Sequence, residues 1–245
     1  MYRNIFDTHA HYDDEKFDED RETLLDSLPS KGVINVINCG CDLSSSLKSI
    51  DFSEKYGYFY SAVGVHPSNI CENSYDELEK IKALYSHPKC VAVGEIGLEY
   101  HYDFVPKDKQ LDIFERQLAL ANELDLPVIV HDREAHEDTM NLLRRYKPKG
   151  VVHCFSGSVE MAKEVLKLGM YIGLGGAVVL SAAVVAAVVF GITNAINNND
   201  AKVAEIDEWI NSPEVMETLT AVDSTQAKID KVALYKADLD TAAYN

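Results

Sequence analysis

The chain has 245 residues, of which 47% are hydrophobic and 26% are charged, as is usual for a folded globular protein. Its 40 acidic residues outnumber the 23 basic ones, and the formal net charge of −17 excludes nucleic-acid binding through a broad basic surface. A phosphate group would therefore have to be held by another positive charge, and a bound metal ion is the natural candidate.

Seven short apolar runs alternate with helical patterns through the first two-thirds of the chain. The runs cover residues 4–10, 33–39, 58–65, 90–96, 127–130, 150–154 and 170–174. Between them, segments such as 108–124 carry apolar residues at helical spacing. Strands that alternate with helices predict parallel βα units. Seven such units favour an α/β fold of the TIM type, a β/α barrel over residues 1–176 with its eighth strand missing or replaced.

Histidines and a glutamate recur at the predicted strand ends, where a β/α barrel carries its active site. His9 and His11 are two residues apart, so both imidazoles face the same side of one strand. Glu95, His131 and His153 follow at three later runs. Each could be a hydrogen-bonded polar residue with no other role, but five of them at equivalent points of a repeating fold predict a metal centre.

The residue types in this set suit zinc, manganese or iron, and two ions could share such ligands. The other histidines, His87, His101 and His136, fall in predicted loops or helices, and we do not expect them to bind metal. The five cysteines have no regular spacing and no secretory signal precedes them, so we expect reduced thiols in a cytoplasmic protein.

Five motifs, in this order and with these separations, resemble the TatD family. They are FDTHAH at 6–11, GVHP at 64–67, VGEIGL at 93–98, LPVIVH at 126–131 followed by DREA, and HCFSG at 153–157. Gln110, Phe114 and Gln117, on the helix before His131, fit the same pattern. TatD proteins are metal-dependent, deoxyribonuclease-like hydrolases of the amidohydrolase superfamily, folded as β/α barrels. The resemblance covers residues 1–176.

The resemblance implies a site for two divalent metal ions, Mg²⁺, Mn²⁺ or Zn²⁺. It implies that His9 and His11 bind one ion and that Glu95 bridges both. It also implies that His131 and His153 complete the second site. Glu95 would thus belong to the catalytic centre as well as to the metal site.

The resemblance further implies that His66 and Arg133 lie near the phosphate of a bound DNA strand. The guanidinium of Arg133 could grip a phosphate oxygen, or it could form a surface ion pair at the start of a helix. Glu99 stands where the family usually has an aspartate, which lengthens the side chain by one carbon.

By the same resemblance, metal-activated water would cleave a phosphodiester, and an aspartate in a Glu-Thr-Asp motif after the eighth strand would take its proton. The spacing of the earlier strand ends places that strand end near residue 203. Asp207 follows Glu205 and Ile206 there, but the apolar spacing around it favours a helix with Asp200 as its N-cap. Asp207 and Asp200 are therefore only weak candidates for the missing carboxylate.

The composition of the chain changes near Gly176. All eight histidines, all five cysteines and twelve of the 13 glycines lie in residues 1–176. We therefore predict a metal-hydrolase barrel portion, 1–176, and a mainly helical tail, 177–245, that is natural, engineered or the result of a truncated fusion. The apolar run 177–192 is long enough to span a membrane, but it lacks basic flanks, and we favour a buried helix that covers the gap in the barrel.

Three functional hypotheses follow. The chain is an active DNA-cleaving metal hydrolase, a metal-binding relative impaired in catalysis by the loss of the late aspartate, or a membrane-attached hydrolase held by residues 177–192. The donor set alone would equally suit amide or ester hydrolysis, because phosphodiester cleavage follows only from the resemblance.

Overall fold

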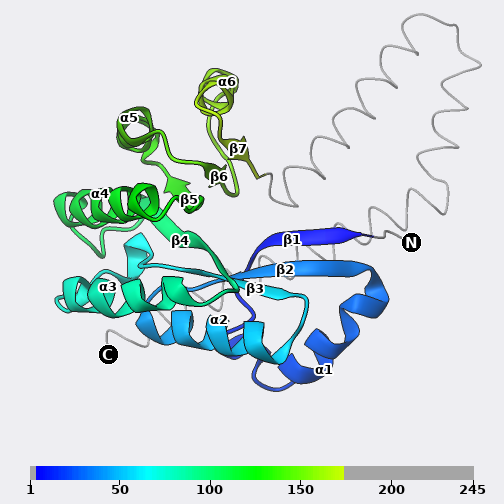
Figure 1. Cartoon of the computed structure of the whole chain (residues 1–245). Coiled ribbons are helices and arrows are strands. Elements are labelled where there is room, and N and C mark those ends of the chain that lie inside the picture. Colours follow the sequence, from blue (N-terminus) through cyan, green and yellow to red (C-terminus); the bar gives the residue numbers. More distant parts are fainter. Residues whose placement is uncertain (1–3, 174–245) are drawn as a thin grey trace, which may run out of the picture. The chain divides into compact units, whose positions relative to one another are not determined.

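The structure of the protein, a computed structural model, describes residues 4–173. Seven parallel strands pair in chain order within these residues and form a sheet that curls as part of a TIM-type barrel (Figure 1). The strands are β1 (Ile5–Ala10), β2 (Val33–Cys39), β3 (Phe59–Val63), β4 (Cys90–Glu99), β5 (Val128–Arg133), β6 (Gly150–Val152) and β7 (Tyr171–Ile172). The predicted fold class is confirmed.

Helices follow the strands and lie along the outer side of the curved sheet (Figure 1). They are α1 (Arg21–Ser27), α2 (Leu43–Lys55), α3 (Ser74–Lys82), α4 (Lys107–Glu123), α5 (His136–Tyr146) and α6 (Val159–Lys167). Short 3-10 turns, η1 (Glu15–Phe17), η2 (Pro29–Lys31), η3 (Pro67–Asn69) and η4 (Ala83–Ser86), complete the connections. The start of α2 is fixed by a capping box in which Asp42 and Ser45 satisfy each other's backbone N–H groups.

Apolar residues cover both faces of the central strands. On the outer face, Val93 of β4 packs with Phe114 and Leu118 of α4. Its neighbour Ala92 points the other way and joins a separate buried cluster. That inner cluster draws one residue from each of β2, β3, β4 and β5, namely Cys39, Ala62, Ala92 and Ile129. A parallel sheet buried on both faces explains why its strands read as apolar runs without alternation.

Strands β4 and β5 extend beyond the apolar runs that predict them. Gly97, Leu98 and Glu99 pair with His131, Asp132 and Arg133, respectively. Gly97 permits this pairing, because its φ is +143° and an added Cβ would lie 2.0 Å from the His131 carbonyl oxygen. Placing His131 just after the run 127–130 was therefore wrong, since it lies inside β5. Glu95 lies inside β4, as the run 90–96 predicts.

Several predictions fall outside the described residues: the eighth strand near 203, Asp200, Asp207 and the run 177–192. The chain divides into two units, and the described residues belong to the first, Met1–Gly173. Within that part, no helix is both long and apolar enough to cross a membrane. All five cysteines are free thiols. The division into 1–176 and 177–245 stays a prediction.

Candidate metal centre

The carboxylate of Glu95 lies at the centre of a cluster of histidines and is only 2% exposed. Its Oε2 lies 2.9 Å from His9 Nε2 and 3.0 Å from His11 Nε2. Its Oε1 lies 2.9 Å from His131 Nδ1 and 2.6 Å from His153 Nε2. Each carboxylate oxygen therefore faces its own pair of imidazole nitrogens, and the structure brings all five predicted ligands together.

Irregular strand pairing aims two of these side chains. The register between β1 and β2 shifts between Asp7 and Ala10, the segment that carries His9. The register between β4 and β5 shifts between Val93 and Ile96, the segment that carries Glu95. Such irregularities bend a strand and redirect a side chain, and they are frequent beside active sites. At the same point the Glu95 N–H donates to the Gly40 carbonyl, 2.9 Å away beyond β2.

Three separate strand ends supply the imidazoles around Glu95 Oε1. His131 comes from β5, His153 from the end of β6, and His66 from the end of β3. His66 Nε2 lies 3.4 Å from the same oxygen, farther than the other two rings. His66 was expected near a phosphate and not as a ligand, but it forms, with Glu95 and His131, one of the donor groups that could hold an ion.

Burial and charge act in opposite directions on the titration of this cluster. Burial opposes ionisation of Glu95, but hydrogen bonds from His11, His131 and His153 hold the pKa of its carboxyl well below the usual value. Burial lowers the pKa of His9 and of His66. For His131, burial is outweighed by Glu95 and Glu99, which raise its pKa to about 9.

The donor geometry fits divalent cations. His9 Nε2 and His11 Nε2 are 3.2 Å apart beside one carboxylate oxygen, and His131 Nδ1 and His153 Nε2 are 3.2 Å apart beside the other. A neutral imidazole has one N–H and one lone pair, so in each of these pairs at least one nitrogen can offer a lone pair. A cation between them would be bound by lone pairs and carboxylate charge together, which is the chemistry of imidazole and carboxylate ligands.

Glu99 and Arg133 extend this polar cluster outward. Glu99 Oε2 lies 3.2 Å from His131 Nε2, so it holds the ring on the side opposite Glu95. Its pKa is lowered: hydrogen bonds from His131 and the His101 N–H outweigh burial. Arg133 Nη1 lies 3.9 Å from Glu99 Oε2, and its side chain is 44% exposed. The positive charge of Arg133 thus stands at the rim of the cluster.

Comparison with known proteins identifies the family. The model for "TatD related DNase" matches residues 6–201. The chain belongs to the TatD family. It is therefore a metal-dependent hydrolase, and the resemblance seen in its motifs is confirmed. The family match continues to residue 201, past residue 176, to which the resemblance was traced.

Individual relatives match about 70% of the chain. The chain is 38% identical to the "uncharacterized metal-dependent hydrolase YabD" of Bacillus subtilis, over 71% of this chain and 69% of the relative. It is 34% identical to a "3'-5' ssDNA/RNA exonuclease TatD" of Cronobacter turicensis, over 70% and 66% of the two chains. The crystal structure of YjjV, a TatD homologue from Escherichia coli, superposes with a TM-score of 0.64 at 35% identity, over 70% and 68%. The chain thus spans about two-thirds of these relatives.

Two TatD-motif glutamines on α4 turn out to brace the metal centre. The Gln117 side chain accepts from the Val65 N–H at 2.8 Å and donates to the Val65 carbonyl at 3.0 Å. The Gln110 side chain does the same for Glu99, at 2.8 and 2.9 Å. Both side chains are buried. The sequence pattern singled out these residues without giving them a role; the structure shows that they fix the backbone beside His66 and at Glu99.

Cys41 is a neighbour of the cluster that the sequence analysis did not place there. Its Sγ lies 3.8 Å from His11 Nδ1, and His11, Cys41 and Glu95 each offer an atom within 4.8 Å of the others. Burial lowers the pKa of His11, but Cys41 and Glu95 outweigh it and raise the value to about 11. Cys41 follows the end of β2 by two residues, and β2 pairs with β1, which carries His9. That position was the one sign in the sequence that Cys41 could lie near the cluster.

The three remaining histidines lie outside the cluster. His87 pairs with Glu54 at 3.4 Å, His101 with Glu134 at 2.7 Å, and His136 with Asp132 at 2.7 Å. None of them belongs to the groups of donors that could hold an ion within the described residues.

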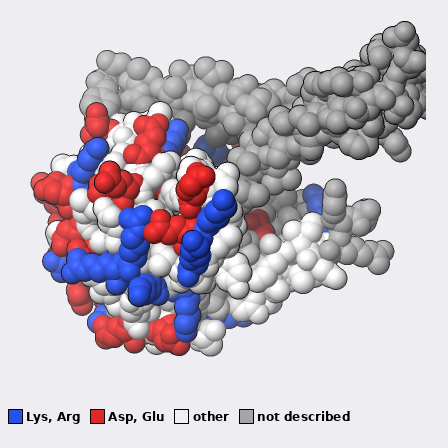
Figure 2. Space-filling model, turned by 90° about the horizontal axis from the view of Figure 1, so that it is seen from above, with Lys and Arg blue, Asp and Glu red and all other residues white. Residues whose placement is uncertain are grey.

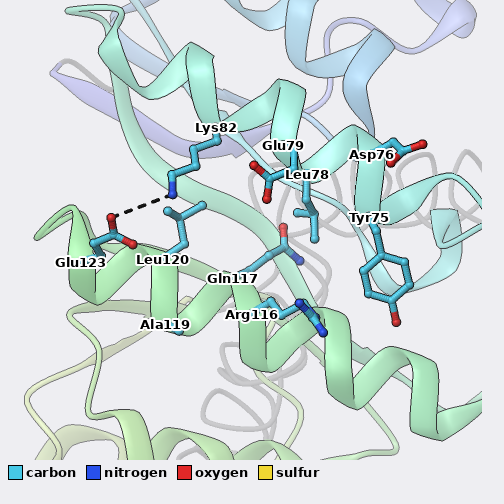
Figure 3. A pocket seen from close by; sticks show the side chains of 10 residues that line it. All are labelled: Tyr75, Asp76, Leu78, Glu79, Lys82, Arg116, Gln117, Ala119, Leu120 and Glu123. Atoms are coloured by element: carbon cyan, nitrogen blue, oxygen red, sulfur yellow. Dashed lines mark ion pairs between the residues drawn. The ribbon is translucent and has the colours of Figure 1, made fainter.

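The surface around the barrel offers no alternative centre of this kind among the described residues. A pocket of about 370 Å³ lies between α3 and α4 (Figure 3). Its walls carry mixed charges, including the Lys82–Glu123 ion pair at 3.9 Å, and it contains none of the clustered histidines. Acidic and basic side chains are interspersed over the face seen in Figure 2.

Proposed function

We propose that this hydrolase cleaves phosphodiester bonds in DNA with the help of two divalent metal ions. One observation carries the proposal: each oxygen of the buried Glu95 carboxylate faces a separate pair of imidazole nitrogens. A carboxylate in that position can bridge two cations. Support for the substrate comes from TatD relatives that are named 3'-5' ssDNA/RNA exonucleases.

The five clustered side chains would divide between the two ions. His9 and His11 would hold one, His131 and His153 the other, and Glu95 would lie between them. When bound, Mg²⁺, Mn²⁺ or Zn²⁺ supplies the positive charge that makes water more acidic and offsets the charge of a phosphodiester. The side chain of Glu95 keeps its negative charge at neutral pH, because its pKa is well below the usual value.

Residues at the rim would bind and orient the substrate. The Arg133 guanidinium is partly exposed and can donate two parallel hydrogen bonds to a phosphate. His66, which follows the end of β3, would contact the same phosphate, whereas Arg133 reaches it from the end of β5. Glu99 would keep the His131 ring in place through its 3.2 Å contact. These contacts offset the repulsion between an acidic protein and an anionic strand.

The proton of the attacking water requires a further acceptor. Among the described residues, the two carboxylates at the centre, Glu95 and Glu99, are both engaged by imidazoles. Asp207 and Asp200 therefore remain the candidates for this role, and both lie outside the described residues.

The test combines metal analysis with a cleavage assay on the full chain. The protein is stripped of metal, reloaded with Mg²⁺, Mn²⁺ or Zn²⁺, and its metal content and cleavage of end-labelled single-stranded DNA are measured. We expect two ions per chain and metal-dependent cleavage. His87→Ala is the matched control, because His87 also faces a carboxylate but lies outside the cluster.

Other outcomes would contradict parts of the proposal. Two bound ions without cleavage of any ester would identify a metal-binding relative impaired in catalysis. Cleavage of carboxylic esters or amides, but not of DNA, would place the chain with another activity of the amidohydrolase superfamily. Failure to bind any divalent ion would overturn the proposal as a whole.

A further inference from the structure

Two aromatic rings stand stacked at the rim of the metal centre, on the loop between β4 and α4. The rings of Tyr102 and Phe104 have centroids 5.1 Å apart and planes only 8° from parallel. Phe104 is 52% exposed, although an apolar ring of this size is ordinarily buried. This loop follows directly on Glu99, so its aromatic rings are attached to the same strand that carries Glu95.

A continuous series of contacts joins this pair to the metal centre. Glu99 Oε2 is 3.2 Å from His131 Nε2, and Arg133 Nη1 is 3.9 Å from Glu99 Oε2. The Arg133 guanidinium in turn lies 5.1 Å from the centre of the Tyr102 ring. A positive charge therefore stands between the metal centre and the aromatic pair. Such an order of groups matches a nucleotide, whose phosphate is flanked by a flat base.

The same pair borders a narrow hollow, too small to hold a water molecule, between the β4–α4 loop and the turn that follows His66. Its lining includes Glu99, Tyr102 and Phe104 from the β4 side, and Pro67 and Ser68 from the turn that follows His66. The hollow is thus bounded by the two residues next to His66 and by the residue that holds His131. The aromatic pair therefore lies beside the turn that directly follows His66.

From this arrangement we infer that Tyr102 and Phe104 form a stacking platform for a nucleobase of a single strand whose phosphodiester lies at the metal centre. The inference rests on the proposed function and adds what it lacks, a subsite for the base. Stacking is open to every base, because each has a flat aromatic face, so this subsite selects single-stranded nucleic acid without selecting a sequence. In a duplex the base would be paired and stacked within the helix, and its face would be unavailable.

Two carboxylates near the platform, Glu134 and Asp138, already have partners of their own. Glu134 is engaged with His101 at 2.7 Å, and Asp138 accepts a hydrogen bond from the Tyr100 hydroxyl at 2.7 Å. The Lys107 ammonium is engaged with a different ring, its Nζ lying 4.1 Å from the centre of the Tyr100 ring. The platform therefore combines aromatic faces with the cation of Arg133, the pairing that single-strand-binding surfaces use.

The experiment measures binding separately from cleavage. A short single DNA strand carries the fluorescent base 2-aminopurine at the first or second position from its 3' end, and Ca²⁺ replaces Mg²⁺ during the titration. Stacking on an aromatic ring quenches this fluorophore. The full-length protein should quench it at one of the two positions. It should also bind that strand about 5- to 100-fold more tightly than a strand with an abasic residue there.

Variants then assign the effect to the platform. Phe104→Leu should abolish both the quenching and the preference over the abasic strand, and Phe104→Trp should restore them. Tyr75→Leu is the matched control, because Tyr75 is a similarly exposed ring, at 45%, on α3 in the wall of a different pocket. An equal preference for the base in wild type and Phe104→Leu, or no preference in wild type, would overturn the inference.

The outcomes separate this inference from the proposed function. If the protein cleaves DNA but Phe104→Leu changes neither quenching nor binding, the proposed function stands and the stacking platform is wrong. Quenching that depends on Phe104, in a protein that cleaves no DNA, leaves the platform and removes the phosphodiesterase. Absence of both binding and cleavage removes both.

Discussion

The two halves of the metal centre, one on each oxygen of Glu95, are built in different ways. On the Oε2 side, His9 lies in β1 and His11 directly follows its last residue, two positions along the chain. On the Oε1 side, His131 and His153 come from different strands, and His66 from a third. The first half is therefore a local arrangement, whereas the second exists only because three strand ends meet.

This difference extends to the residues that support each half. The Oε2 side has Cys41 beside His11 and the backbone carbonyl of Cys39, 2.9 Å from His11 Nδ1. The Oε1 side has Glu99 on His131 and a glutamine clamp on the backbone next to His66. On the Oε1 side, glutamine side chains of α4 thus hold the backbone at Val65 and Glu99. On the Oε2 side, the end of β2 and the residues after it contact His11 instead.

The largest effect is expected from breaking both halves at once with Glu95→Gln. The amide keeps the shape but loses the negative charge that both pairs of imidazoles face. Loss of a residue that only supports a ligand costs about 10- to 100-fold in metal affinity or activity, so loss of this shared carboxylate should exceed about 100-fold. Metal analysis and the cleavage assay measure it; Glu54→Gln is the control, and unchanged metal content would contradict the assignment.

The two halves can be separated by paired substitutions. His9→Ala with His11→Ala should remove one of the two ions, and His131→Ala with His153→Ala should remove the other, because each pair faces a different oxygen of Glu95. Metal content by elemental analysis should fall from two ions to one in each double variant. A double variant that keeps both ions, or loses both, would show that the halves are not independent sites.

The pH dependence of metal binding sharpens the comparison. An imidazole binds metal only without its second proton, and the pKa is raised to about 9 for His131 and to about 11 for His11. Protons therefore compete with metal below these values, and affinity should rise with pH by about tenfold per unit for each proton displaced. Between pH 9 and 11 only the His11 half should still gain.

Calorimetric titration in buffers of different ionisation enthalpy measures this proton release. We expect protons to be released to the buffer at pH 7 and fewer above pH 9. The His87→Ala protein should behave like wild type, because His87 lies outside the cluster. An affinity that does not change between pH 6 and 9 would contradict the assignment of these imidazoles as ligands.

The smallest effect is expected at the α4 clamp. Gln117→Leu leaves the Val65 N–H and carbonyl without their partner in a buried position. An unsatisfied buried group costs about 1–3 kcal/mol, so the free energy of unfolding should fall by at least about that amount. Urea denaturation measures it, with the exposed Lys109→Leu on the same helix as control; equal stability of the two variants would show that the clamp does not stabilise the barrel.

Much of the fold was readable because local and global requirements agree. The predicted run at 33–39 coincides with β2, since Val36 and Cys39 are apolar residues buried in the sheet. The ends of β4 and β5 could not be predicted from the sequence. Glu99 and Arg133 are charged residues that break the apolar pattern, and they belong to the strands only because they pair with each other across the β4–β5 ladder. The pairing of Gly97 with His131 depends on a close backbone approach that no local pattern reports.

The candidate site divides in the same way. His9 and His11 could be placed on one side of a strand from their spacing, because a strand has a period of two. The spacing could not predict which oxygen of Glu95 each imidazole would face, because that depends on where separate strand ends meet. The clamps by Gln110 and Gln117 were equally hidden, since a glutamine on a helix gives no local sign of the backbone it will contact.

The sequence by itself determined the repeating βα architecture, the residue types that suit a divalent metal, and the family to which the chain belongs. Only the tertiary structure decided that one buried carboxylate would be shared by two pairs of imidazoles and that an aromatic pair would stand beside Arg133 at the rim. The physical reason is range. Strand periodicity and apolar patterning act between near neighbours in the chain, whereas contacts between residues such as His9 and Glu95 form only when distant strands are folded together.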